Sequence, residues 1–167
     1  GIDLDLSSEF DQIRNSITHH AGRDYAASRG EYLNGIILAK LLGYDFIDAA
    51  YVIYFRENGS FDDEGTNEVL KELLKKHTHA VIPGFYGSMP NGTVKTFSRG
   101  GSDITGSVVA RAAGADLYEN FTDVSGFFMT DPRIVENPRR IDVITYAELR
   151  ELSYMGAMVF HEDAIFP

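Results

Sequence analysis

The sequence predicts an α/β fold in which a mainly parallel sheet is covered by helices on both faces. Amphipathic segments of helical period alternate with short apolar segments, the pattern of a chain that returns to one sheet after each helix. The short segments are continuously apolar, as expected for strands that are buried on both faces. The chain has 167 residues, of which 44% are hydrophobic and 24% charged. We therefore expect one globular domain or part of one.

Five segments are predicted to be helices because their apolar residues recur every three or four positions. In the first, Phe10, Ile13 and Ile17 form such a stripe. The second is apolar on most sides and stops at Gly43, as helices often do at a glycine. The predicted helices cover residues 8–21, 32–42, 66–76, 102–113 and 145–155.

Short segments rich in β-branched and aromatic residues are predicted to be strands. A Pro-Asn-Gly turn between apolar flanks predicts a hairpin over residues 86–97. An irregular stretch is expected up to residue 137, and a final strand or helix start over residues 158–166. The predicted single strands cover residues 49–55, 79–83 and 117–121. Ligands bind such sheets at the carboxyl ends of strands, so the loops that lead into helices are candidate sites.

Composition excludes several functional classes. With 15 Lys and Arg residues against 25 Asp and Glu residues, the chain lacks the cationic surface that sequence-independent nucleic-acid binding requires. No segment has the roughly 18 apolar residues that cross a bilayer, and no secretion signal is visible. There are no cysteines, so thiolate metal sites are excluded and a reducing compartment is favoured. We expect no nucleic-acid or membrane partner and a cytoplasmic location.

The stretch FSRGGSD, residues 97–103, lies between a predicted strand and a predicted helix. Two glycines allow a sharp turn and close approach to a ligand, and the first amides of the helix are unpaired donors. Arg99 would add a forked donor for a carboxylate, and Asp103 could hold a cation or orient a lysine. The alternative is structural: Ser102 or Asp103 caps the helix and the glycines make a tight turn.

A second loop, TDVSGFFMTDPR at residues 122–133, begins where a strand is predicted to end. Its two phenylalanines could flank a purine, Arg133 could reach phosphates, and Asp123 could accept hydrogen bonds. As an isolated feature, the sequence favours the structural alternative, a solvated loop with a turn at Asp-Pro-Arg.

Two further candidates have simple structural alternatives. Glu31, in the segment SRGE, is expected near the start of the second helix, where the helix dipole alone favours an acid; its functional role would be to bind a substrate ammonium group. His77 and His79 form an HxH pair, but a zinc site is not expected without cysteines or a suitably spaced third histidine. No protein-held metal site is predicted.

Six segments in this order and at these separations resemble the aspartokinases, which are members of the amino acid kinase family. The segments are SRGE, PGFYGS, FSRGGSD, TDVSGFFMTDPR, ITYAELRELSYMGA and VFHEDAIFP. The resemblance runs from about residue 27 to residue 167. It implies a three-layer α/β/α sandwich around a mostly parallel sheet, which agrees with the prediction from the pattern of elements.

The resemblance implies transfer of the ATP γ-phosphoryl group to the side-chain carboxylate of L-aspartate, which opens lysine, threonine and methionine synthesis. Matched by position, Arg99 would bind the α-carboxylate of aspartate and Glu31 its ammonium group. Ser102 would bind the remaining polar edge, and Phe85 would wall the pocket. Asp103 would have the catalytic role of organising a lysine.

On the nucleotide side, the resemblance implies that Thr122, Asp123, Phe128 and Arg133 surround adenosine and phosphates. ATP and Mg²⁺ are the implied cofactors, because phosphoryl transfer asks a protein chiefly for alignment and charge stabilisation. Phe128 replaces a common tyrosine, and Met158 stands where the family has a phosphate-facing lysine.

Two features of the family are not found between residues 1 and 167: the glycine-rich KFGGTS loop and the C-terminal ACT domains. We therefore expect the chain to be a partial catalytic domain, inactive alone, of a homo-oligomeric protein. Two alternatives stay open: another amino acid kinase acting on glutamate or a nucleoside monophosphate, or a non-catalytic binding or regulatory subunit.

Overall fold

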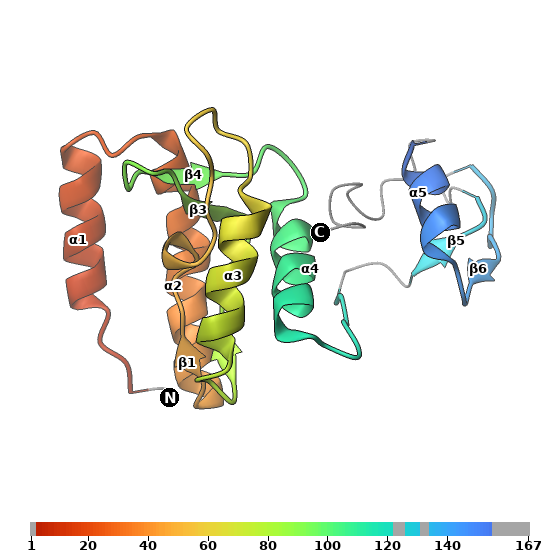
Figure 1. Ribbon diagram of the computed structural model, residues 1–167, viewed down its shortest axis with the longest axis horizontal. Coiled ribbons are helices and arrows are strands. Elements are labelled where there is room, and N and C mark those ends of the chain that lie inside the picture. The colour runs from red at the N-terminus through yellow and green to blue at the C-terminus, as the bar shows by residue number, and fades with distance from the viewer. Residues whose placement is uncertain (1–2, 122–125, 131–133, 155–167) are drawn as a thin grey trace.

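The structure, a computed structural model, describes residues 3–121, 126–130 and 134–154 (Figure 1). Its helices are α1 (Ser7–Thr18), α2 (Arg23–Leu42), the 3₁₀ helix η1 (Ala49–Tyr51), α3 (Asp63–Leu74), α4 (Gly101–Ala113) and α5 (Tyr146–Tyr154). Its strands are β1 (Asp45–Phe46), β2 (Ala80–Val81), β3 (Tyr86–Ser88), β4 (Val94–Thr96), β5 (Phe127–Phe128) and β6 (Arg140–Ile141).

The strands β1 and β2 are parallel and have helices on both sides. Phe46 of β1 points to α2, where a Cβ on Gly35 would come within 2.9 Å of its ring. The next residue, Ile47, points the other way and joins the buried core with Leu70 of α3 and Val108 of α4. Figure 1 shows α2 and α3 on opposite sides of β1. The predicted α/β class is confirmed.

The core is built mainly from aliphatic residues of the strand region and of the facing sides of α3 and α4. Ile53, Leu70 and Tyr86 are completely buried. Arg111 of α4 also forms an ion pair with Asp63 of α3, at 3.0 Å. The α4 helix is therefore held along its length by apolar packing and a polar contact.

Helix α2 begins nine residues earlier than predicted. The sequence analysis placed its start at Tyr32, whereas the structure begins the helix at Arg23, after Gly22. The buried residues of its first half include Ser28, which is fully buried, and Arg29. Polar residues at buried positions do not register in an apolar periodicity, which explains the error. As a consequence, SRGE lies inside the helix, and the prediction that Glu31 sits near its start is wrong.

The predicted strand over residues 49–55 is also wrong. Its first residues form the 3₁₀ helix, because the Asp48 carboxylate accepts a hydrogen bond from the Ala50 amide and caps the turn. Only Tyr54 and Phe55 make isolated bridges, the former parallel to Ser88. The local cap outweighs the strand propensity of this segment.

The predicted hairpin over residues 86–97 is confirmed. β3 and β4 pair in the antiparallel sense with Tyr86 opposite Thr96. Gly92 has a φ of +79° in the connecting turn, a conformation that glycine adopts without strain. The strand predicted over residues 79–83 is confirmed as the shorter β2, and the helices predicted over 66–76 and 102–113 are confirmed as α3 and α4.

The strand predicted over residues 117–121 is not formed, and these residues have no regular secondary structure. β5 and β6 form a short antiparallel pair, and α5 confirms the helix predicted over 145–155. Figure 1 shows β5, β6 and α5 apart from the helices and strands of the first 114 residues. The element predicted over residues 158–166 lies outside the described residues. Among the residues that are described, no helix is long and apolar enough to cross a membrane.

Candidate substrate site at the start of helix α4

Two loops meet at the start of α4, one following β2 and the other following β4. The Phe97 amide donates a hydrogen bond of 2.9 Å to the Phe85 carbonyl oxygen. The Phe85 amide in turn donates to the Thr105 hydroxyl oxygen in α4, at 3.1 Å. These hydrogen bonds lie at strand ends that lead toward a helix. The sequence predicts a ligand site at such a position.

Two glycines allow the loops to approach the helix this closely. A Cβ on Gly101 would lie 2.7 Å from the Phe85 Cβ and 2.8 Å from its Cα. A Cβ on Gly84 would lie 3.2 Å from the Ser102 Cα. Gly101 of the FSRGGSD stretch therefore allows the start of α4 to lie directly against the backbone of Phe85.

The N-terminus of α4 is a potential anion-binding position. Its N-cap is Gly100, which has a φ of +60° and no side chain with which to cap the helix. The structural alternative, in which Ser102 or Asp103 is the N-cap residue, is therefore wrong. Ser102 is exposed and Asp103 is half-buried, so polar groups of both residues reach solvent beside the first helix amides. This end of the helix carries the positive end of its dipole.

Phe85 has a φ of +64°, which is strained for an aromatic residue. Its conformation is fixed by the two hydrogen bonds described above and by its neighbour Tyr86. The Tyr86 hydroxyl donates a hydrogen bond of 2.7 Å to Asp48. Burial and the nearby Asp48 carboxylate raise the pKa of Tyr86, so this tyrosine stays protonated as the donor. Strain of this kind is characteristic of functional positions.

Asp103 is held by a residue that the sequence analysis missed. The Asn120 side-chain amide donates a hydrogen bond of 3.1 Å to the Asp103 carboxylate. Tyr118, two residues earlier, packs against Gly106, where a Cβ would lie within 3 Å of the tyrosine ring. Burial and then the Asp103 charge raise the pKa of Tyr118. Residues 118–120 thus fold back along α4 toward its start.

Neither Thr105 nor Asn120 carries a sequence signal for these contacts. A threonine in a helix and an asparagine in a predicted strand are unremarkable, and the partners of Thr105 and Asn120 lie 20 and 17 residues away. Only the tertiary structure identifies them.

Arg99 and Glu31 are both exposed. Arg99 lies in the loop that directly precedes α4, next to Gly100. Glu31 lies in the middle of α2, and within the described residues it makes no hydrogen bond or ion pair with the α4 residues. The structure therefore places Phe85 against the first turn of α4, which carries Ser102 and Asp103, and Arg99 precedes this turn in the chain. Among the described residues, no hydrogen bond or ion pair joins Glu31 to this group.

Arg29 links the SRGE segment to the loop that carries Phe85. Its guanidinium lies 4.4 Å from the centre of the Tyr25 ring, 4.5 Å from Tyr32 and 5.5 Å from Tyr86. It also donates hydrogen bonds to the Ser28 hydroxyl. These contacts fix α2 against β3, one residue from Phe85.

The predicted nucleotide residues are only partly described. Phe128 lies in β5, half-buried and opposite Arg140 in β6. Thr122, Asp123 and Arg133 lie outside the described residues, and so does Met158. Figure 1 shows β5, which carries Phe128, apart from α4.

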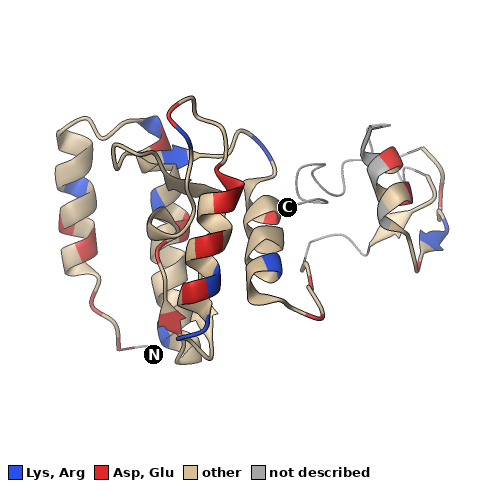
Figure 2. Ribbon diagram, viewed as in Figure 1, with Lys and Arg blue, Asp and Glu red and all other residues tan. Residues whose placement is uncertain are grey.

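The charges of the described residues are mixed, with acidic and basic side chains on the same helices (Figure 2). Among these residues there is no group of three or more His, Cys, Asp or Glu side chains that could hold a metal ion. His77 contacts the Asp45 carboxylate at 2.7 Å, and His79 stacks on Tyr44 at 4.6 Å. The HxH pair therefore has structural partners.

An α/β fold with a glycine-rich loop entering a helix at the strand ends defines a class of proteins that bind small anionic ligands. A sequence model of the amino acid kinase family matches residues 2–167. The chain belongs to this family.

Its relatives within the family are aspartokinases. Aspartokinase 3 of Bacillus subtilis (strain 168) is 42% identical over 153 residues, covering 86% of this chain and 34% of that protein. The aspartokinase of Rickettsia prowazekii (strain Madrid E) is 35% identical over 159 residues, covering 90% of this chain and 36% of that protein. The chain thus spans about a third of the length of these relatives.

Solved structures that are similar to this chain are also aspartate kinases. The aspartate kinase of Clostridium acetobutylicum superimposes with a TM-score of 0.92 at 60% identity, covering 100% of this chain and 38% of that chain. Aspartokinase III of E. coli, solved in complex with aspartate and ADP, has a TM-score of 0.83 at 28% identity, covering 97% of this chain and 41% of that chain.

Proposed function

We propose that the protein to which this chain belongs transfers the γ-phosphoryl group of ATP to the side-chain carboxylate of L-aspartate, giving 4-phospho-L-aspartate. The observation that carries the proposal is the packing of Phe85 against the first turn of α4, which carries Ser102 and Asp103 and directly follows the loop with Arg99. Membership of the amino acid kinase family and the similarity to an aspartokinase crystallised with aspartate and ADP support it.

The start of α4 suits a substrate with a carboxylate. Arg99 would bind the α-carboxylate through a forked pair of hydrogen bonds, beside the first amides of the helix. Ser102 is exposed and would bind a remaining polar edge, while the Phe85 ring would exclude water from one side. Glu31 would bind the ammonium group, which requires that the substrate bridge the α2 and α4 residues.

Asp103 would orient the lysine that contacts the phosphates. Its carboxylate is at the first turn of α4 and is held by Asn120. Phosphoryl transfer depends on alignment of the acceptor oxygen with the γ-phosphorus and on neutralising charge on the phosphates. A carboxylate fixed at both its backbone and its side chain limits the positions that such a lysine can adopt.

The nucleotide would be bound by Thr122, Asp123, Phe128 and Arg133, with Phe128 against the base. Mg²⁺ would arrive with the phosphates of ATP, since magnesium in such sites uses one or two carboxylates together with phosphate oxygens.

We further propose that residues 1–167 are part of a catalytic domain and that a lysine loop and ACT domains belong to the complete protein. In this proposal the chain has one side of the site and is inactive alone. The complete protein is proposed to be a cytoplasmic homo-oligomer, a state that light scattering of the purified full-length protein would test.

The decisive experiment measures ADP release by the full-length protein with Mg-ATP and one acceptor at a time. Aspartate should support turnover, and 4-phospho-L-aspartate should be trapped with hydroxylamine as its hydroxamate. Turnover with glutamate or a nucleoside monophosphate, but not with aspartate, would replace the proposal with another amino acid kinase. Binding of aspartate without nucleotide binding or turnover would favour a regulatory subunit.

A further inference from the structure

We infer that Thr105 is a positioning residue for the acceptor substrate, acting through Phe85. The inference rests on the proposed function for its substrate and on the hydrogen bonds of Thr105 for its mechanism. Thr105 was not among the candidate residues of the sequence, and it lies on the buried side of α4, two residues after Asp103.

Phe85 needs an external constraint to keep its backbone conformation. A φ of +64° places the Cβ of a side chain in a crowded region that aromatic residues rarely occupy. A relaxed backbone at this residue would turn the ring away and also move its carbonyl oxygen, which accepts the hydrogen bond from Phe97. Both the wall of the pocket and the loop before Arg99 therefore depend on this one residue.

The Thr105 hydroxyl supplies that constraint with both of its hydrogen-bonding functions. It accepts the hydrogen bond from the Phe85 amide at 3.1 Å and donates to the Gly101 carbonyl oxygen at 2.7 Å. The donation is an ordinary bond within a helix, spanning four residues. Because the Thr105 hydroxyl hydrogen is directed to Gly101, the oxygen lone pairs stay available to accept the hydrogen bond from the Phe85 amide. Thr105 is 4% exposed, so water does not replace either bond.

Three contacts around Phe85 converge with this bond. The Gly101 backbone lies against Phe85, Gly84 lies against Ser102, and Tyr86 is anchored to Asp48. Beside these contacts, Thr105 hydrogen-bonds the Phe85 backbone to the helix that carries Ser102 and Asp103. A shift of the ring by about 1 Å at a binding pocket can change rates by roughly 100-fold.

The chain contains a matched control in Thr66. This threonine also lies in a helix, α3, and is completely buried. Its hydroxyl accepts a hydrogen bond from the Tyr54 amide at 2.9 Å, the same contact in another part of the molecule. Replacing either threonine by valine removes the hydroxyl at constant shape and leaves a buried amide without its acceptor.

The test compares Thr105→Val, Thr105→Ser and Thr66→Val in the full-length protein, with the KM for aspartate and for ATP measured separately. Thr105→Val should raise the KM for aspartate on the order of tenfold or more and leave the KM for ATP within about twofold. Thr105→Ser keeps the hydroxyl and should stay close to wild type. Thr66→Val should leave both KM values unchanged.

Amide hydrogen exchange gives a readout that does not need turnover. Exchange at the Phe85 amide should be slow in the wild type and in Thr66→Val, and faster in Thr105→Val; in Thr66→Val the faster amide should be that of Tyr54. A purely structural role would produce equal effects of the two valine variants on both KM values, and that result would overturn the inference. Unchanged exchange at Phe85 in Thr105→Val would overturn it as well.

The failure of the proposed function can be told apart from the failure of this inference. A wild-type protein that shows no turnover with aspartate contradicts the proposed function, and the Phe85 exchange then decides whether Thr105 holds this loop. Should Thr105→Val reduce the amount of folded protein, Thr105→Ala provides a second variant without the hydroxyl. Thr105→Ser, which keeps the hydroxyl, must then retain the wild-type KM for aspartate and slow exchange at the Phe85 amide.

Discussion

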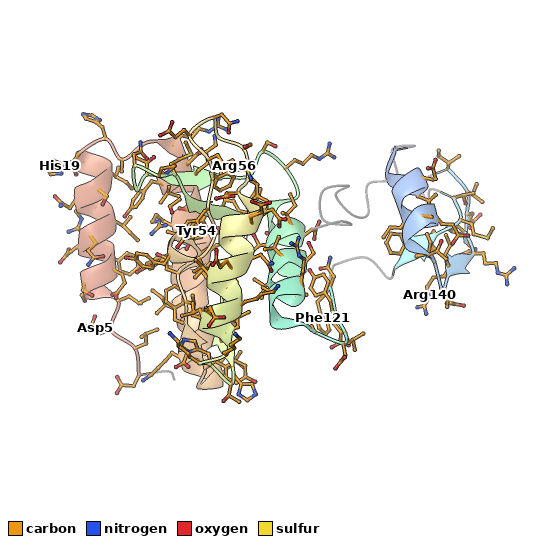
Figure 3. The ribbon with its side chains drawn as sticks, in the orientation of Figure 1. Asp5, His19, Tyr54, Arg56, Phe121 and Arg140 are labelled. Carbon is orange, nitrogen blue, oxygen red and sulfur yellow. The ribbon has the colours of Figure 1, made fainter. Side chains whose placement is uncertain are left out.

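The loops at the start of α4 and the segment that follows α4 differ in how they are held. At Phe85 and Tyr86, three hydrogen bonds join residues that are up to 38 positions apart. After Gly114, by contrast, large apolar side chains are exposed: Leu117 by 75%, Phe121 by 90% and Met129 by 65%. Figure 3 shows Phe121 at the outer side of the segment beyond α4.

This difference shows which half of the proposed site is specified within the described residues. The proposed substrate side is built from contacts between α4 and the loops after β2 and β4. The nucleotide side has Phe128 in a two-residue strand pair, apart from α4.

The largest expected effect is that of Arg99→Ala in the full-length protein. Removing a charged, forked donor to a carboxylate costs about 3 kcal/mol, or roughly 100-fold in the KM for aspartate. The KM for ATP should change little. Phe128→Ala should raise the KM for ATP and change the KM for aspartate little. Initial rates with each substrate varied in turn measure both KM values. Loss of selectivity in either variant would contradict the division of the site into two sides.

Gly101→Ala should destabilise the substrate side. The added Cβ would lie 2.7 Å and 2.8 Å from Phe85 atoms, and overpacking of this kind costs about 1–3 kcal/mol in the free energy of unfolding. Gly30→Ala is the control, because Gly30 lies inside α2 with nothing within 4 Å of an added Cβ. It should stabilise by about 1 kcal/mol through helix propensity. Urea unfolding of the chain measures both, and effects of the same sign would contradict the close approach at Gly101.

Asn120→Ala tests the contact between the segment after α4 and the substrate side. Loss of one hydrogen bond to the half-buried Asp103 carboxylate should cost about 1 kcal/mol, or roughly fivefold in kcat. Asn91→Ala is the control, since Asn91 accepts hydrogen bonds only from Thr93 in the hairpin turn. Equal kcat values for wild type and Asn120→Ala would show that Asp103 needs no support from Asn120.

The smallest effect is expected for Phe121→Ser in the isolated chain. A side chain that is 90% exposed contributes little to folding, so the free energy of unfolding should change by less than about 0.5 kcal/mol. The same substitution in the full-length protein should cost more if further parts of the protein cover this surface. A loss above about 2 kcal/mol in the isolated chain would remove the contrast between the two regions.

Elements with strong local signals were predictable. The apolar stripes of α3 and α4 and the Pro-Asn-Gly turn of the β3–β4 hairpin follow from short-range periodicity and turn chemistry. The start of α2 was not predictable, because Ser28 and Arg29 are polar residues at buried positions, and the Arg29 guanidinium lies over the Tyr86 ring, which is distant in the sequence. The segment over residues 49–55 has a strand composition, yet the Asp48 cap turns it into a 3₁₀ helix.

The candidate site divides in the same way. The motif FSRGGSD indicated Arg99, Ser102 and Asp103 from the sequence, because chemistry that needs a glycine, a guanidinium and a carboxylate at fixed spacing leaves those residue types in the chain. Phe85 was indicated only by the resemblance to the family. Thr105 and Asn120 were decided only by the tertiary structure. Their hydrogen bonds join residues 20 and 17 positions apart, and a common side chain acquires such a role only when folding brings its partner within about 3 Å.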